Sequence, residues 1–292
     1  MDIKLERASY IYPNFSINSH ENLRNINISI ETGKWISVIG HTGSGKSTLM
    51  KLLKGLIAPT NGHLLINGRV NELSKKGKAQ IIHDIGLVFQ YPEHQLFETT
   101  VIKDLVFGPK NQGIEMKEAI KRAEDMIQLV GLSEEYFQKA PLQLSGGEKR
   151  RVAIATVLMM NPEVLILDEP TAGLDPLGSK LILQLIHDWY KAGDGHRTVI
   201  FVTHEMNEVA EYSDEVLVMN NGEIAFQESP LSLFLNHDYE LKEFGLDIPD
   251  TVKLLQLIEQ RFGDYIEVAS LQEEVVLKDV IAYFQKQGAE IL

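Results

Sequence analysis

A glycine-rich segment with one lysine has the residue types and spacing needed to bind phosphate groups. It fits the pattern G-x-x-x-x-G-K-[ST], follows an apolar run at Trp35 to Ile39 and opens a helical pattern. Glycines let successive backbone N–H groups surround a phosphate, and a helix start adds the positive end of its dipole. This context disfavours the alternative of a simple turn that contains lysine. The residues expected to bind ATP are Gly40, His41, Thr42, Gly43, Ser44, Gly45, Lys46, Ser47 and Thr48.

Two adjacent carboxylates follow another apolar run, Val164 to Leu167. Desolvating both at the end of a buried strand is costly unless something compensates their charge, and Mg²⁺ with ATP would do so. We therefore expect Asp168 and the Ser47 hydroxyl to hold Mg²⁺. Glu169, pointing the opposite way on an alternating backbone, would act as the general base that takes a proton from the attacking water. The alternative is a solvated strand end.

A second glycine-containing helix start lies between these two segments. Leu144 is followed by Ser145, Gly146, Gly147 and Glu148, and a helical pattern then continues to Met160. Such a start can bind an anion through its free N–H groups, although it can also carry no ligand. One nucleotide needs only one phosphate loop. The segment resembles the signature motif of the ABC (ATP-binding cassette) family, where it faces the nucleotide held by the opposite subunit.

The resemblance covers about residues 1 to 230 and implies roles for four further residues. Tyr12 would stack on adenine, the alternative being an ordinary core tyrosine. Gln90 would contact Mg²⁺ or water, and Asp175 would belong to the loop that crosses the dimer interface. His204 would contact the γ-phosphate as a second catalytic residue. The resemblance also implies that two cassettes close on two ATP molecules, and a heterodimer is favoured over a homodimer.

The segment after Gln90 resembles that of energy-coupling-factor and cobalt/nickel importer ATPases. Its apolar and acidic residues suit a socket for a membrane partner, although a surface loop with a buried Leu-Phe pair is the alternative. The implied partners are an integral membrane scaffold (T component) and a substrate-binding membrane component (S component). Two departures are the stretch Tyr12 to Asn18, which lacks a Pro-Gly pattern, and Glu148, where many members have Gln. The expected coupling residues are Tyr91, Pro92, Glu93, Leu96 and Phe97.

Strand and helix patterns alternate along the chain and must position these residues. The alternation predicts a mostly parallel sheet covered on both faces. Val216 to Phe226 predicts a hairpin with an Asn-Gly turn, and amphipathic helices follow at Thr251 to Phe262 and Glu273 to Gln287. The expected fold is an α/β P-loop core with an N-terminal antiparallel part. We place the nucleotide-binding domain at 1–228, its helical subdomain at about 92–160, and a helical appendage at 229–292.

Composition narrows the functional classes. The chain has 292 residues, a formal net charge of −13 and no cysteine, which argues against a nucleic-acid coat and excludes disulfides and thiolate metal sites. No secretory signal or spanning helix is expected, so a membrane role needs another polypeptide. We expect a peripheral ATPase at the cytoplasmic face of the membrane that energises uptake of a vitamin, micronutrient or transition metal. The alternatives are the ATPase of another ABC importer or exporter, and a non-transport ABC ATPase acting on DNA or ribosomes.

Overall fold

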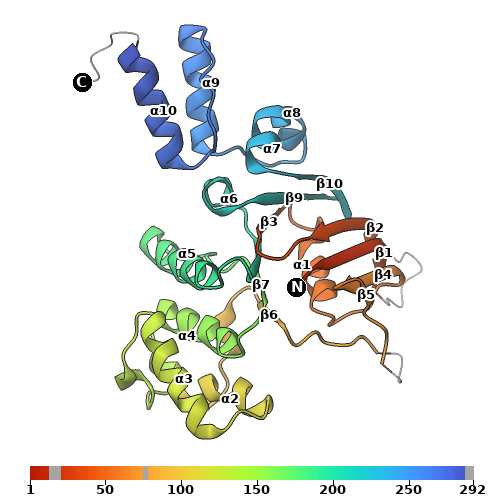
Figure 1. Ribbon diagram of the computed structural model, residues 1–292, viewed down its shortest axis with the longest axis vertical. Helices are drawn as coiled ribbons and strands as arrows, with labels where there is room; N and C mark the ends of the chain where they lie inside the picture. The colour runs from red at the N-terminus through yellow and green to blue at the C-terminus, as the bar shows by residue number, and fades with distance from the viewer. Residues whose placement is uncertain (13–20, 75–77, 287–292) are drawn as a thin grey trace.

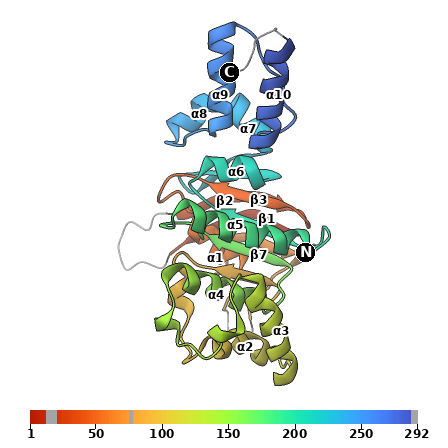
Figure 2. The ribbon, with the colours of Figure 1, turned by 90° about the vertical axis from the view of Figure 1, so that its left-hand side faces the viewer.

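The computed structural model describes residues 1–12, 21–74 and 78–286 (Figure 1). The stretch Tyr12 to Asn18 is therefore described only at Tyr12, and Gln287 also lies outside the described residues. Two β-sheets form the middle of the molecule. Helices α2, α3 and α4 lie at one end of it and α9 and α10 at the other (Figures 1 and 2).

A six-stranded sheet carries the predicted site, in the order β10-β9-β3-β8-β7-β6. All neighbouring pairs are parallel except β9 and β10, which form the predicted hairpin around Asn221 and Gly222. Strands β3 and β8 are buried along their whole length, which explains their nearly continuous apolar sequence. The strands are β3 (Trp35–Ile39), β6 (Ile85–Val88), β7 (Val164–Asp168), β8 (Thr198–Val202), β9 (Glu215–Asn220) and β10 (Glu223–Glu228).

A four-stranded antiparallel sheet forms the N-terminal part, in the order β2-β1-β4-β5. The alternation expected at Ile26 to Ile30 is present, because Ile26, Ile28 and Ile30 are buried while the residues between them are exposed. The sequence prediction overlooked β1. The strands are β1 (Ile3–Ile11), β2 (Glu21–Ile30), β4 (Asn61–Ile66) and β5 (Arg69–Val70).

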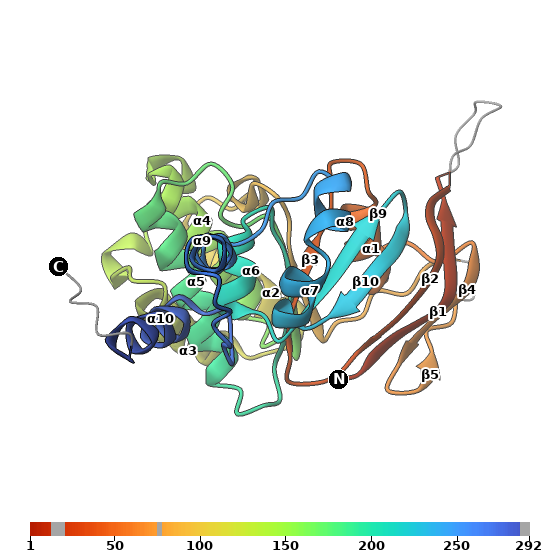
Figure 3. The ribbon, with the colours of Figure 1, turned by 90° about the horizontal axis from the view of Figure 1, so that it is seen from above.

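Helices cover both faces of the six-stranded sheet. Helix α1 packs between the two sheets (Figure 3), whereas α5 covers the opposite face together with α4. Helices α2, α3 and α4 pack in the same apolar core as α5 and this face of the sheet. The helical part therefore shares its core with the sheet. The helices are α1 (Lys46–Leu53), α2 (Val101–Asn111), α3 (Met116–Leu129), α4 (Gly146–Leu158), α5 (Pro176–Lys191) and α6 (Met206–Tyr212), with short 3₁₀ helices η1 (Pro92–Gln95), η2 (Glu134–Tyr136) and η3 (Pro141–Gln143).

Four further helices follow β10 and have their own apolar core, to which α6 and β9 contribute. Asn207 on α6 exchanges two 2.8 Å hydrogen bonds with Asp250, which ties α9 to the sheet region. In the parts of the chain that are described, no helix is long and apolar enough to cross a membrane. The helices are α7 (Pro230–Asn236), α8 (Asp238–Glu243), α9 (Asp250–Phe262) and α10 (Glu273–Lys286).

Candidate functional site

The phosphate loop joins the end of β3 to the start of α1, as expected. Gly40 has φ 154° and Gly45 has φ 108°, and a Cβ atom would lie 2.3 Å from the Met219 carbonyl oxygen at the first position and 2.8 Å from that of Asn22 at the second. Only glycine fits both places without a shift of the backbone. The Ser44 hydroxyl in the same loop is buried and has no hydrogen-bond partner among the described residues. A bound phosphate group would satisfy it.

Lys46 folds back over this loop. Its Nζ donates to the carbonyl oxygens of Gly40, at 2.6 Å, and His41, at 3.1 Å. The side chain is buried, and burial lowers the pKa of its ammonium group although Glu169 and Asp168 act to raise it. The charge is therefore only partly compensated within the chain. An anionic ligand in the loop would complete the compensation.

Asp168 is the last residue of β7, and its carboxylate lies close to the start of α1. Burial raises the pKa of Asp168, whereas a hydrogen bond from the Ser47 side chain lowers it. One carboxylate and one hydroxyl side by side supply the hard oxygen ligands that Mg²⁺ prefers, with water and substrate oxygens filling the other positions. The residues present therefore fit a magnesium ion.

Glu169 does not continue the alternation of β7, which corrects the sequence expectation. Its φ is 50°, and its N–H donates to the Val202 carbonyl oxygen on β8. This left-handed turn, rather than strand alternation, aims the carboxylate. Gln90 donates its Nε2 to one oxygen at 2.8 Å, and His204 Nε2 lies 2.6 Å from the other. The ends of the adjacent strands β6, β7 and β8 thus bring three predicted residues together.

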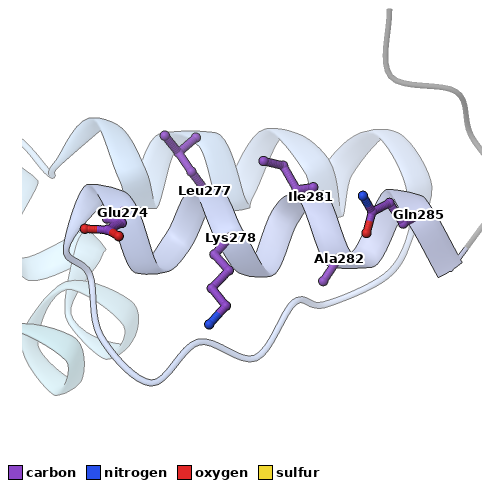
Figure 4. Close-up of a pocket in the computed structure, with 6 residues that line it drawn as sticks. All are labelled: Glu274, Leu277, Lys278, Ile281, Ala282 and Gln285. Carbon is purple, nitrogen blue, oxygen red and sulfur yellow. The ribbon is translucent and has the colours of Figure 1, made fainter.

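A cavity of about 400 Å³ adjoins this carboxylate and includes Glu169, Thr203, His204 and Glu208 in its lining. A separate hollow of about 480 Å³ lies on the outer face of α10 and contains none of the predicted site residues (Figure 4). Its lining residues are Glu274, Leu277, Lys278, Ile281, Ala282 and Gln285. The first cavity therefore adjoins the expected base, whereas the phosphate loop and Asp168 lie outside its lining.

The signature segment forms the start of α4. Ser145 is the N-cap: its Oγ accepts a 3.3 Å hydrogen bond from the Glu148 N–H, and the Glu148 carboxylate accepts a 2.8 Å bond from the Ser145 N–H. Tyr136 donates to Glu148 at 2.7 Å, and this bond is the main cause of the lowered pKa of Glu148. Gly146 and Gly147 open α4, where the first N–H groups of a helix have no partner within the helix, and nothing lies within 4 Å of a Cβ position at either residue. None of the described side-chain hydrogen bonds connects this segment to the phosphate loop.

Two residues implied by the family resemblance have structural contacts here. Asp175 is the N-cap of α5 and accepts a 2.8 Å hydrogen bond from the Gly178 N–H. Tyr12, which is half-buried, lies edge-on to Tyr10 with ring centroids 4.9 Å apart.

The coupling segment, residues 91–97, contains a residue with a left-handed backbone conformation and a partly buried carboxylate. Tyr91 has φ 59° and precedes η1, in which Pro92 is buried. Phe97 is 65% exposed and lies edge-on to Phe107, whereas Leu96 packs against the core of α2 to α4. The expected apolar pair thus consists of one exposed side chain, Phe97, and one partly buried side chain, Leu96. The Glu93 carboxylate pairs with Arg150 rather than facing solvent freely.

Sequence reasoning missed three polar side chains around the site, of which Asp104 and Arg150 are buried and Glu208 is half-buried. Glu208 accepts a 2.7 Å hydrogen bond from Thr203, next to His204, and a second from Thr171. Asp104 accepts bonds from the N–H groups of Phe97 and Glu98. Arg150 follows the signature segment on α4 and bonds Glu93. Most of their partners are backbone groups or side chains distant along the chain, so no sequence motif marks them.

Comparisons with known proteins agree with this geometry. Residues 23–172 match the family model of ABC transporters. The energy-coupling factor transporter ATP-binding protein EcfA2 of Bacillus subtilis (strain 168) is 47% identical over 90% of this chain and 95% of its own, and that of Geobacillus kaustophilus is 43% identical over 98% of both. The structure of cbiO1 from Clostridium perfringens, part of the ABC transporter complex cbiONQ, matches with a TM-score of 0.71 and 35% identity over 89% of this chain and 95% of that one.

A dimeric structure of the ATP-binding cassette MJ0796, bound to ADP and Pi in a post-hydrolysis state, matches with a TM-score of 0.67 and 30% identity over 78% of this chain and 98% of that one.

Fold, phosphate loop and acid pair together define an ABC-type ATPase. Within that class, the chain belongs to the family of energy-coupling factor transporter ATP-binding proteins. The α/β fold with its mostly parallel sheet, N-terminal antiparallel sheet and helical parts is confirmed.

Proposed function

We propose that this chain hydrolyses ATP with Mg²⁺ at sites completed by a second cassette. The observation that carries the proposal is the position of Glu169, clamped by Gln90 and His204 at the edge that also holds the phosphate loop. A carboxylate oriented on both sides is suited to accept a proton from an attacking water. In this scheme His204 would turn from Glu169 and contact the γ-phosphate.

The magnesium ion would be held by Ser47 and Asp168, with Gln90 contributing directly or through water. Bound there, it would neutralise developing charge on the phosphate oxygens. Lys46 and the N–H groups of the loop would hold the β and γ phosphates. In this scheme the chain mainly positions charges, as is usual for phosphoryl transfer.

The second half of each site would come from a partner cassette. Gly146 and Gly147 are the first residues of α4, so their N–H groups have no partner within the helix. An N-terminal helix end of this kind binds anions, so it would cover the γ-phosphate held by the partner. Asp175 would lie in the loop at that interface. The cassette of MJ0796 is dimeric, and we favour a heterodimer with a similar cassette for this chain.

The partners in the membrane would be a scaffold (T component) and a substrate-binding component (S component). The relatives are named as ATP-binding proteins of energy-coupling factor transporters. The exposed side chains of Tyr91 and Phe97 would offer the membrane partners an apolar contact. The chain would work peripherally at the cytoplasmic face and energise uptake of a vitamin or other micronutrient. A net charge of −13 gives no basis for a nucleic-acid partner.

We further propose the domain division into residues 1–228, with a helical subdomain at about 92–160, and an appendage at 229–292. The appendage has its own apolar core and leaves Leu277 and Ile281 partly exposed on α10. A contact between the appendages of two cassettes would cover these side chains.

The experiment is purification of the complex from its native membrane through a tag on this chain. We expect a second cassette and two integral membrane proteins to co-purify, and ATP hydrolysis that stops when EDTA removes Mg²⁺ and returns when Mg²⁺ is restored. Co-purification of ribosomes or DNA at physiological salt, with no membrane protein, would overturn the transport assignment. Hydrolysis that persists in EDTA would overturn the magnesium assignment.

A further inference from the structure

Arg150 is a buried cation with partners in two separate parts of the chain. It lies on the first turns of α4 and is 4% exposed. Its Nε and Nη2 donate to the two oxygens of Glu93 in η1, at 3.2 and 3.3 Å. Its Nη1 donates to the carbonyl oxygens of Pro170, at 3.2 Å, and Ala172, at 2.7 Å.

These partners lie in two segments that must be linked if docking of a membrane partner is to affect hydrolysis. Glu93 lies in the coupling segment, and Pro170 and Ala172 follow Glu169 directly and lead to Asp175. Although burial acts to raise it, the hydrogen bond from Arg150 holds the pKa of Glu93 below its ordinary value. A planar guanidinium with a fork on a carboxylate and two further bonds has one favoured orientation. If η1 moves, Arg150 must move with it or lose its partner.

We propose that Arg150 is a positioning residue that transmits displacement of the coupling segment to the backbone of residues 170–172, and so to Glu169 and the loop at the cassette interface. The inference rests on the proposed function. It assigns the Glu93 carboxylate to a contact inside the chain rather than to the membrane partner. Docking of the membrane partner on Tyr91 or Phe97 would then shift the Glu169 carboxylate through the Arg150 side chain.

The neighbouring Arg151 shows what a purely architectural arginine does on this helix. Its Nη1 donates to the carbonyl oxygens of Val130 and Gly131 at the end of α3. It therefore fastens two helices of the same bundle to each other. The two arginines have the same charge and both bond backbone carbonyls, so Arg151 is a matched control for Arg150.

The test is amide hydrogen exchange in the full-length chain carrying Glu93→Gln. The reporters are the N–H groups of Ala172 and Leu174, which donate to the Glu169 and Thr171 carbonyl oxygens. Removing one charged hydrogen bond from Arg150 should speed their exchange about tenfold. Arg150→Lys keeps the charge but cannot make the pair of hydrogen bonds to Glu93. It should therefore speed exchange at the same two N–H groups. Arg151→Lys should change exchange at Gly131 and Leu132 and leave Ala172 and Leu174 as they were.

Unchanged exchange at Ala172 and Leu174 in both Glu93→Gln and Arg150→Lys would overturn the inference, and so would an equal change in Arg151→Lys. A second readout uses the native complex with each variant. Stimulation of ATP hydrolysis by the membrane partners should fall about tenfold in Arg150→Lys while the partners still co-purify. Full stimulation would contradict the inference. Failure of the unchanged chain to hydrolyse ATP or to bring down membrane proteins would instead refute the proposed function, and exchange in the isolated chain would still decide the role of Arg150.

Discussion

His204 Nε2 lies 2.6 Å from Glu169 Oε1, so the residue expected to contact the γ-phosphate is in contact with the expected base. Gln90 holds the other carboxylate oxygen at 2.8 Å. With both oxygens engaged, the base has one defined orientation before a substrate water arrives. Binding of a γ-phosphate would draw His204 away and free one oxygen of Glu169 for that water.

Replacement of His204 by Ala should therefore slow hydrolysis much more than it weakens ATP binding. We expect turnover to fall about 100-fold, the usual loss when one positioned group is removed from a reaction of this kind. Phosphate release measures turnover and a fluorescent ATP analogue measures binding. His196→Ala, at an exposed position before β8, is the control and should keep normal turnover. Near-normal turnover in His204→Ala would show that the contact is incidental.

Lys46→Met should separate ligand binding from stability. The variant should lose ATP affinity about tenfold or more, because the cation that faces the phosphates is gone. The nucleotide-free protein should be at least as stable as before, because burial lowers the pKa of Lys46 and its charge is costly without a ligand. ATP titration and urea unfolding test the two effects. Lys110→Met, at an exposed position on α2, should change neither. A large loss of stability with unchanged affinity would assign Lys46 to the fold.

Phe97 and Leu96 should behave differently when each is changed to Ala. Phe97→Ala should reduce the amount of membrane partner that co-purifies, at unchanged thermal stability, because the ring is 65% exposed. Leu96→Ala should cost about 1 kcal/mol or more of unfolding free energy, because the side chain packs on the core of the helical part. Exposed Leu257 on α9 supplies the control, and Leu257→Ala should keep the partners bound. Normal assembly and transport with both substitutions combined would remove this segment as the docking site.

Asp104 should make stability depend on pH. Burial raises the pKa of Asp104, so the folded chain retains its proton to higher pH than the unfolded chain does. Stability contributed by the protonated form is complete below the ordinary value of 3.8 and is lost as pH rises through the raised pKa. Asp104→Asn should therefore gain stability relative to the unchanged chain as pH rises from about 4 to 8. Urea unfolding across this range measures the difference. Asp125→Asn on the exposed side of α3 should show no such trend, and a parallel trend in both variants would exclude Asp104 as its source.

The sequence indicated the elements whose apolar pattern is simple. Strand β3, the hairpin of β9 and β10, and helix α9 lie where periodicity and turn residues place them. Strand β1 was overlooked because its sequence mixes apolar and polar residues without a simple pattern. It forms a strand through pairing with β2, in an irregular register, and with β4, which lies distant along the chain.

Motif order predicted which side chains meet but not how they are held. Gln90, Glu169 and His204 come together because they end neighbouring strands, which a sequence can suggest. The left-handed turn at Glu169 is a tertiary effect, fixed by its N–H bond to Val202 on β8. The same holds for Glu93, whose charge looked available for a partner until the fold brought Arg150 beside it.

The most direct test of the central claim is phosphate release by the purified native complex in which this chain carries Glu169→Gln, measured in a single turnover with ATP bound at this chain's phosphate loop. We predict that ATP binding is retained and that release from this site slows about 100-fold, because the amide cannot take a proton from water. Glu163→Gln, just before β7 at its opposite end, is the control and should release phosphate normally. Near-normal release from the Glu169→Gln site would contradict the assignment of Glu169 as the base.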